Sequence, residues 1–415
     1  MVNLKSNKRS LLLLVVCLLV ACGPALPAVW SSATPSAATV TPLPSATPSA
    51  TSGPLVHYEL EERCFQVAEE PLPADVRGTL WIELRREDRV YEEAVLDLDT
   101  DAITRNEDWH IFSISPRSTR VSYYGPNFES MVVADTGFRT IWQLHQLEDA
   151  EGSLHFADWV GDTHIILAKI GEAPKGSRFF PLLGYVLIDL ENGARREFQT
   201  DDYPGHLLLA APHTWWTPEL VINPNLDVLI YPNYGGLILW DIEQGGALAD
   251  VYGGQVASPP SWAPSGEYAV VSTYMSAEGN TNVDDGLPNR GWDLLLISNT
   301  GAIERLTYFG AEVGAWQRYY QWSPDGEYIS FLQNPVSYDG NYRGDLMLVE
   351  VGTGQIIDYC VKHNYRVYWS ADSRYFAVYL EDGEGLPSLH IVEVSTGCAW
   401  IVHENAGVSG WLAAP

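Results

Sequence analysis

The sequence QWSPDGEYISFL, residues 321–332, predicts two short strands joined by a tight turn. Pro324 presets φ for the second position of such a turn, Asp325 is favoured at the third, and Gly326 accepts a positive φ. The flanking residues are mostly aromatic or aliphatic, with Tyr, Ile and Phe prominent, and such residues favour strands. The stretch therefore predicts a β-hairpin.

Related hairpins recur along the chain. Close copies are SWAPSGEYAVVS at 261–272 and YWSADSRYFAVYL at 368–380, and weaker copies begin at residues 113, 158 and 221. A second hairpin follows each copy, so that each repeat holds four strands. Each copy has an apolar anchor near its start, and the anchors are spaced 40 to 63 residues apart: Ile114, Trp159, Ile222, Trp262, Trp322 and Trp369. Repeats of this length and strand content are typical of propeller blades.

The two ends of the domain complement each other. Residues 79–84 and 94–104 predict the second, third and fourth strands of a blade that lacks its innermost strand. Residues 409–415, SGWLAAP, predict an innermost strand, and Trp411 stands where the next anchor is expected. A C-terminal strand that completes the N-terminal blade leaves no open sheet edge between the first and last blades. We predict an all-β propeller of seven four-stranded blades over residues 78–415, with six blades as the alternative.

Residues 1–21 predict a secretory signal, because a lysine- and arginine-containing start precedes the short apolar run 11–20. The sequence LVAC at 19–22 resembles the bacterial lipoprotein signal, in which the cysteine carries the lipid. The resemblance implies that Cys22 is the lipidated first residue of the mature chain. The alternative is an ordinary cleaved signal followed by an incidental cysteine. We therefore expect an extracytoplasmic protein that is anchored to a bacterial membrane through Cys22.

The segment 22–54 is composed mainly of Ser, Thr, Ala and Pro, which predicts a disordered, semi-extended tether. Residues 55–77 form an N-terminal arm between the tether and the propeller. The formal net charge of the whole chain is −29. A surface this acidic repels phosphate backbones, so the composition argues against nucleic acid as a partner.

The pattern W-S-P-D-G-x-Y-I-x-F at 322–331 resembles the repeats of TolB-type, WD-repeat-like propellers of the bacterial envelope. The resemblance covers nearly the whole of 78–415, although the copies at 113, 158 and 221 depart from it at the Asp-Gly step. Members of that family mostly bind proteins, peptides or glycans, and some form the gating domain of peptidases. The resemblance implies a binding scaffold and no single ligand.

The long connections of the predicted blades all fall between the second and third strands or between one blade and the next. In a propeller, these connections lie on one face, where they surround the mouth of the central channel. They are rich in aromatic rings and in Asp and Asn, which suit peptides and sugars. Packing between blades is the alternative role for such aromatic residues. The candidate ligand-binding residues are Tyr203, His213, Trp215, Trp216, Asp284, Asp285, Trp292, Trp316, Tyr319 and Tyr338.

The chain carries no G-x-S-x-G or H-E-x-x-H motif, and no hydrolase-sized region lies outside the propeller. We therefore expect a non-catalytic protein without a cofactor, which binds a protein, peptide or glycan of the cell envelope on its loop-rich face. One alternative is a carbohydrate-active enzyme that uses loop carboxylates such as Asp284 and Asp285. Another is a structural scaffold of the envelope, whose partner holds the outer edges of the blades.

One acidic stretch matches part of a calcium-binding loop. In DLDTDAITRNED, residues Asp97, Asp99, Asp101 and Asp108 occupy positions 1, 3, 5 and 12 of such a loop, but Ala102 replaces the glycine expected at position 6. The same letters fit the hairpin between the third and fourth strands of the first blade. We retain calcium only as a weak candidate.

Three cysteines follow Cys22 in the predicted mature chain, and an extracytoplasmic location permits a disulfide between two of them. Cys64 lies in the arm that enters the closing blade, and Cys398 follows a turn on the neighbouring blade. We therefore predict a Cys64–Cys398 disulfide. The alternative considered is Cys360–Cys398, whose members lie toward opposite ends of their strands.

Overall fold

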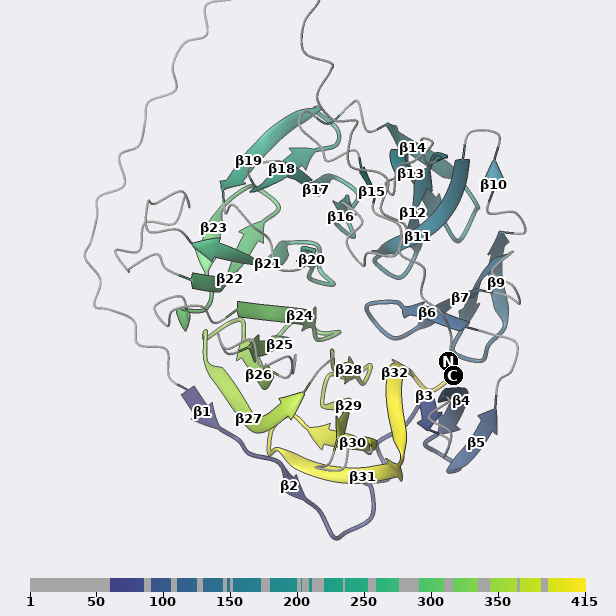
Figure 1. Ribbon diagram of the computed structural model, residues 1–415, viewed down its shortest axis with the longest axis vertical. Helices are drawn as coiled ribbons and strands as arrows, with labels where there is room; N and C mark the ends of the chain where they lie inside the picture. Colours follow the sequence, from purple (N-terminus) through teal and green to yellow (C-terminus); the bar gives the residue numbers. More distant parts are fainter. Residues whose placement is uncertain are drawn as a thin grey trace, which may run out of the picture. The chain divides into compact units, whose positions relative to one another are not determined.

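The computed structural model is a seven-bladed β-propeller (Figure 1). Seven separate antiparallel meanders surround one centre, with the first strand of each blade innermost and the fourth at the rim. The structure describes these residues: 60–85, 91–105, 110–124, 130–144, 148–149, 152–172, 180–199, 203, 209–210, 220–233, 236–252, 259–275, 291–309, 316–334, 344–363, 366–381 and 387–415.

The first four blades are numbered along the chain from the N-terminal blade. Blade 1 consists of β32 (Ala406–Leu412), β3 (Thr79–Arg85), β4 (Tyr91–Asp97) and β5 (Ala102–Arg105). Blade 2 consists of β6 (His110–Ile114), β7 (Arg120–Tyr124), β8 (Met131–Asp135) and β9 (Thr140–Leu144). Blade 3 consists of β11 (Gly152–Val160), β12 (His164–Ile170), β13 (Phe180–Asp189) and β14 (Arg195–Gln199), with the short β10 (Glu148–Asp149) on β11 and β15 (Leu209–Ala210) on β13. Blade 4 consists of β16 (Val221–Ile222), β17 (Val228–Asn233), β18 (Gly236–Asp241) and β19 (Gly246–Tyr252).

The remaining three blades complete the ring. Blade 5 consists of β20 (Ser261–Trp262), β21 (Tyr268–Met275), β22 (Gly291–Ser298) and β23 (Ile303–Arg305). Blade 6 consists of β24 (Trp316–Trp322), β25 (Tyr328–Asn334), β26 (Gly344–Glu350) and β27 (Ile356–His363), with β1 (Leu60–Glu62) on its outer edge. Blade 7 consists of β28 (Tyr368–Trp369), β29 (Tyr375–Glu381), β30 (Pro387–Glu393) and β31 (Cys398–Glu404), with β2 (Gln66–Val67) on its outer edge.

The hairpin at 321–332 forms as its sequence predicts. The N–H of Gly326 donates to the carbonyl of Ser323 at 2.9 Å, and Gly326 has φ of 77°. The Ser323 hydroxyl donates to Asp325, and the N–H of Tyr328 donates to the Ser323 Oγ at 2.9 Å. These bonds form within the turn, and the N–H of Asp325 donates to the Ser373 Oγ of blade 7 at 3.0 Å, so the turn is held both locally and by the next blade.

The copies at 113, 221 and 368 make the same turn with other residues at the left-handed position. Ser118, Leu226 and Ser373 have φ of 59°, 63° and 59° where blade 6 has glycine. A positive φ has a free-energy cost in a non-glycine residue, and the packing of the surrounding blade must offset that cost. The departures from Asp-Gly therefore alter the residue in the turn and leave the hairpin intact.

The hydrophobic core consists of seven clusters, and each one lies between two neighbouring blades. The tryptophan anchors pack into these clusters toward the preceding blade. The Trp322 indole N–H donates to the Ser261 carbonyl of blade 5 at 2.9 Å, and the Trp262 indole N–H donates to the Val221 carbonyl of blade 4 at 3.2 Å. Each such anchor thus fixes the distance between two blades as well as burying its own ring.

The C-terminal strand closes the ring, and the predicted count of seven blades is confirmed. Strand β32 pairs antiparallel with β3, with Trp411 opposite Leu80 and Ala406 opposite Leu84. Trp411 is 1 % exposed, and its indole N–H donates to the Arg77 carbonyl at 3.2 Å. The last strand of the chain therefore serves as the innermost strand of its first blade.

The N-terminal arm is a strap across the outer edges of blades 6 and 7 (Figure 1). Strand β1 pairs parallel with β27, and β2 pairs parallel with β31. Between them, the Phe65 ring lies 5.6 Å from Tyr359 and 6.3 Å from Phe376, centroid to centroid. A Cβ on Gly397 would lie 2.7 Å from the Arg63 carbonyl oxygen, so only glycine allows the strap to approach this closely. The strap gives two blades a fifth strand and covers their open edges.

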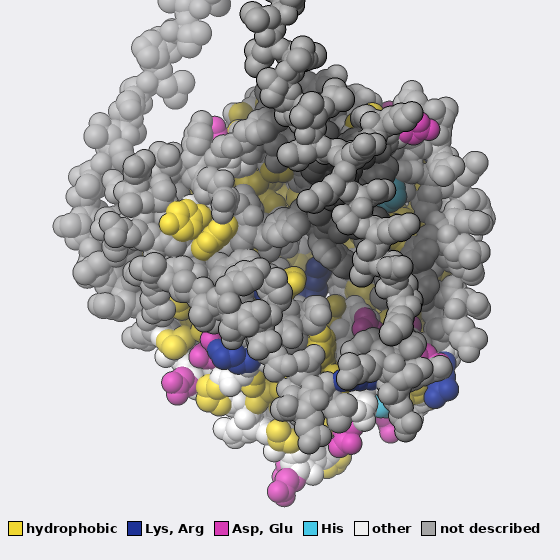
Figure 2. Space-filling view, viewed as in Figure 1, with side chains coloured by type: hydrophobic (Ala, Val, Ile, Leu, Met, Phe, Trp, Pro, Cys, Tyr) yellow, Lys and Arg dark blue, Asp and Glu magenta, His cyan; other side chains and the backbone are white. Residues whose placement is uncertain are grey.

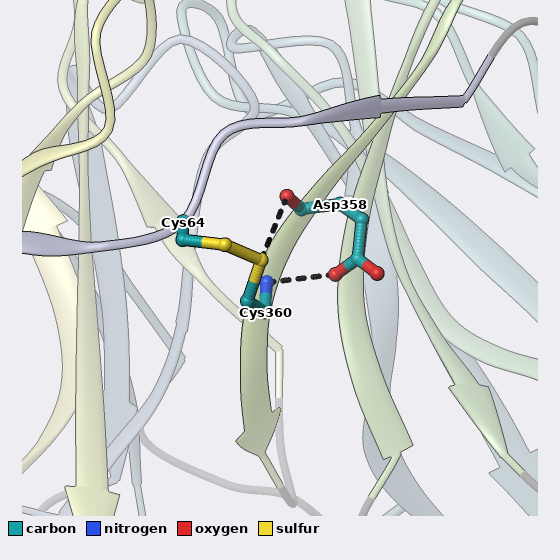
Figure 3. Close-up of a disulfide and its surroundings, with 3 residues drawn as sticks. All are labelled: Cys64, Asp358 and Cys360. Carbon is teal, nitrogen blue, oxygen red and sulfur yellow. Dashed lines mark hydrogen bonds between the residues drawn. A yellow bond between two sulfur atoms is a disulfide. The ribbon is translucent and has the colours of Figure 1, made fainter.

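The disulfide joins Cys64 to Cys360, so the predicted Cys64–Cys398 pair is wrong (Figure 3). The parallel pairing of β1 with β27 brings Cys64 beside Cys360, with their Cα atoms 4.8 Å apart. Cys398 lies opposite Gln66 instead and is a free cysteine. At Cys360 the backbone has φ of 58°, and its N–H donates to the Asp358 carboxylate at 2.7 Å. The arm passes along blade 6 before it reaches blade 7, and the sequence pattern does not predict this path.

The predicted signal, lipidated Cys22 and tether lie outside the described residues. Among the residues that the structure does describe, no helix is long and apolar enough to cross a membrane.

Replacing Cys64 by Ser should lower the free energy of unfolding by about 2–4 kcal/mol, because the disulfide ties the strap to blade 6. Denaturant unfolding of the full chain measures the change, and hydrogen exchange at the Arg63 and Phe65 amides localises it, since both bond to β27. Cys398→Ser is the matched control and should unfold at the wild-type denaturant concentration. Equal midpoints for the two variants would contradict a stabilising role for the strap disulfide.

Candidate functional site

The two faces of the propeller carry connections of different length. On one face, the turns within each first and second hairpin are short, and all of them fall within the described residues. The other face carries the connections between second and third strands and between blades, and most of these lie outside the described residues. We call the first the turn face and the second the loop face. Acidic side chains are scattered over the view in Figure 2 instead of gathering in one patch.

An aromatic pair lies in blade 5 where the connection between its second and third strands begins and ends. Tyr274 near the end of β21 lies directly opposite Trp292 near the start of β22, and their ring centroids are 5.8 Å apart in an edge-to-face arrangement. Tyr274 is 41 % exposed and Trp292 is partly buried. The rings thus form an accessible apolar surface on rigid strands at the loop face.

A buried ion pair supports this aromatic pair. Asp293, next to Trp292, accepts a bond from the Arg305 guanidinium at 2.6 Å and one from the Thr307 hydroxyl at 3.0 Å. The side chains of Asp293 and Arg305 are 0 % and 1 % exposed. Arg305 Nε donates to the Thr307 carbonyl, and the N–H of Leu294 donates to the Thr307 hydroxyl. The network ties the ends of β22 and β23 together beneath the loop face.

A second buried polar chain links blades 5 and 6 at the same end. The Ser272 hydroxyl donates to Gln317 at 3.4 Å, and the Gln317 amide donates to Gln333 at 2.8 Å. The Tyr320 hydroxyl bonds to the Pro259 carbonyl, which joins β24 to the segment that enters blade 5. Hydrogen-bonded buried polar groups favour one blade arrangement over others, because any shift leaves them unsatisfied.

The structure places four of the ten predicted ligand-binding residues. Trp292 belongs to the aromatic pair above. Tyr203 is only 7 % exposed and packs against Tyr231 and Trp240, so the structure places it in the core and corrects the predicted binding role. Tyr319 is partly buried on the inner strand β24, with the Arg318 guanidinium 4.8 Å from its ring centroid. Trp316 begins β24, and its side chain is not described. The other six lie outside the described residues: His213, Trp215, Trp216, Asp284, Asp285 and Tyr338.

The described part of the acidic stretch, residues 97–105, forms the predicted hairpin turn between β4 and β5. The Asp97 carboxylate accepts hydrogen bonds from the N–H groups of Asp99 and Thr100. Within the described residues, no group of three or more His, Cys, Asp or Glu side chains is arranged to hold a metal ion. Asp108 lies outside those residues, so the four-carboxylate calcium candidate is not assembled in the described structure.

Two carboxyl groups that the sequence analysis did not select have raised pKa values. Burial, followed by the nearby charge of Glu93, raises the pKa of Glu83. Burial raises the pKa of Asp158 to about 6. Asp158 immediately precedes the Trp159 anchor, a position held elsewhere by uncharged residues: Ser113, Val221, Ser261, Gln321, Tyr368 and Gly410. Aligning the repeats on their anchors therefore distinguishes Asp158 from the sequence alone, because it is the only charged residue at this position.

The comparisons agree with the fold. No protein-family model matches the chain, and no curated protein sequence matches it. Among solved structures, a mutant of puromycin hydrolase complexed with PGG is 12 % identical, with a TM-score of 0.50 and coverage of 83 % of this chain and 57 % of that one. TolB from Acinetobacter baumannii is 12 % identical, with a TM-score of 0.39 and coverage of 81 % and 67 %. At these identities the likeness shows the propeller fold alone, and the chain spans little more than half of the puromycin hydrolase.

Replacing Asp293 by Ala should cost about 3–5 kcal/mol of unfolding free energy, because the buried Arg305 would lose the carboxylate that it pairs with in the described structure. Denaturant unfolding measures the loss. Asp75→Ala is the matched control: Asp75 pairs with Arg374 at the same 2.6 Å, but both side chains are more than half exposed. Its unfolding midpoint should stay at the wild-type value. Equal effects of the two substitutions would show that burial does not increase the contribution of the Asp293–Arg305 pair to the unfolding free energy.

Proposed function

We propose that this chain is an extracytoplasmic, lipid-anchored binding protein that captures a peptide or a glycan at its loop face without catalysing a reaction. The lipoprotein-like signal ending at Cys22 and the Ser-, Thr-, Ala- and Pro-rich tether support the location. The extracytoplasmic location is compatible with the Cys64–Cys360 disulfide, because disulfides persist in oxidising compartments.

The observation that carries the binding function is the aromatic pair formed by the exposed Tyr274 and the partly buried Trp292. Aromatic side chains that stand on rigid strands lose little conformational entropy on binding and offer large contact areas. The Asp293–Arg305 network directly behind the pair holds the strand ends in place. A site built in this way needs no movement of the scaffold to accept a ligand.

The binding test uses the full chain in non-ionic detergent, with a panel of peptidoglycan fragments, envelope polysaccharides and short peptides. A ligand at a hundredfold excess over its Kd should raise the unfolding free energy by about 2.7 kcal/mol, which thermal unfolding detects. Tyr274→Ala and Trp292→Ala should each weaken binding of that ligand about tenfold or more, as measured by titration calorimetry.

Tyr268→Ala is the matched control. Tyr268 lies on the same strand β21 and is equally exposed at 41 %, but it stands at the turn-face end. The Tyr268→Ala variant should bind the ligand as tightly as the wild type does. Loss of binding in Tyr268→Ala with retention in Tyr274→Ala would overturn the assignment to the loop face. Hydrolysis of a panel member during the titration would overturn the non-catalytic part of the proposal.

A further inference from the structure

A cavity of about 70 Å³ lies on the turn face, away from the loop-face site. It is formed where the inner strands of blades 3, 4 and 5 enter their turns, with the turn of blade 2 at its edge. Three prolines and two indoles contribute much of its apolar wall, and one carboxylate stands among them. The residues that line it include Pro116, Asp158, Trp159, Ile222, Pro224, Trp262 and Pro264.

The cavity exists because of an exception in the repeat. An anchor packs toward the residue that precedes the anchor of the previous blade, as Trp262 does toward Val221 and Trp322 toward Ser261. By this register, the anchor of blade 4 faces Asp158, and that anchor is Ile222 instead of tryptophan. The smaller side chain leaves room beside Asp158, the only charged residue at the position that precedes an anchor.

In the part of the chain that the structure describes, no cationic side chain is in contact with Asp158. Among the described residues, its carboxylate accepts one hydrogen bond, from the adjacent N–H of Trp159 at 2.8 Å. Arg366 of blade 7 acts on it only as a distant charge, and no ion pair joins the two groups. The nearest turn carboxylate, Asp162, is already paired with Arg117. A carboxylate accepts several hydrogen bonds when ionised, so most of the capacity of Asp158 is unused.

We propose that this cavity binds a primary alkylammonium group, with the Asp158 carboxylate as its counter-charge and the indole and proline walls around its methylene groups. The volume favours this ligand class. An apolar cavity of about 150 Å³ accommodates benzene, so 70 Å³ excludes an aromatic or sugar ring and admits the end of an alkylammonium chain. A neighbouring indole face also favours a cation. The group has two sources, a lysine side chain or the free amino terminus of a partner peptide.

The protonation state of Asp158 sets the pH dependence. The pKa near 6 means that the carboxyl is mostly neutral at pH 5 and ionised at pH 8. The propylammonium probe stays protonated over that range. The affinity should therefore fall about tenfold from pH 8 to pH 5, in proportion to the ionised fraction of Asp158.

The experiment titrates the full chain, in non-ionic detergent and with ¹⁵N-labelled tryptophan, with propylammonium at pH 8. The Trp159 indole resonance, assigned through Trp159→Phe, should shift and saturate. Propanol at the same concentrations is the neutral control and should leave it unmoved. Asp158→Asn should abolish the shift, whereas Asp162→Asn, four residues along the same hairpin, should preserve it. Ile222→Trp should also abolish it by filling the cavity.

A saturating shift in Asp158→Asn equal to that of the wild type, or equal affinity at pH 5 and pH 8, would overturn the proposal. So would an equal response to propanol. Two further titrations distinguish the sources, one with Nα-acetyl-lysine amide and one with glycinamide. Tighter binding of the first assigns the site to a lysine side chain, and tighter binding of the second to an amino terminus. The absence of a shift with any of the three ammonium compounds would also overturn the proposal.

Discussion

The pairing of β32 with β3 is the contact on which the rest of the propeller depends. A ring of separate sheets stays closed only if its first and last blades are joined, and here one blade contains both ends of the domain. Trp411 and Leu80 form a cross-strand pair at the centre of that blade. Gly410 allows Ile114 of blade 2 to approach so closely that a Cβ would collide with it. The closing strand thus also sets the spacing of the next blade.

The strap adds a second long-range constraint and makes the ring asymmetric. Blades 6 and 7 have a fifth strand on their outer edges, and the Cys64–Cys360 disulfide holds it there. The outer strands of the other five blades carry no such parallel strand among the described residues. The disulfide lies between the two parallel pairings, so it fixes the strap to blade 6 before the chain reaches blade 7.

The two faces differ in how the polar groups near their strand ends are satisfied. The turn face consists of short turns whose polar groups bond within the hairpin, as among Ser323, Asp325 and Gly326, and also to the turn of the next blade, as from the Asp325 N–H to Ser373. The loop face carries the long connections, and buried polar networks such as Asp293 with Arg305 hold the strand ends beneath them. The Asp158 cavity belongs to the turn face. It arises where the regular packing of anchors is interrupted, and it is independent of the loop-face site.

The sequence by itself determined the hairpins, the seven anchors and the closing strand, because turn chemistry and strand alternation act over a few residues and repeat along the chain. It also pointed to Trp292 as a residue of the loop face. Tertiary structure alone decided which cysteine meets Cys64, since the partner depends on how the arm crosses two blades. It likewise buried Tyr203 against Trp240 and left space beside Asp158. These outcomes depend on lateral contact between segments far apart in the chain, and no local pattern of residues encodes which segments become neighbours.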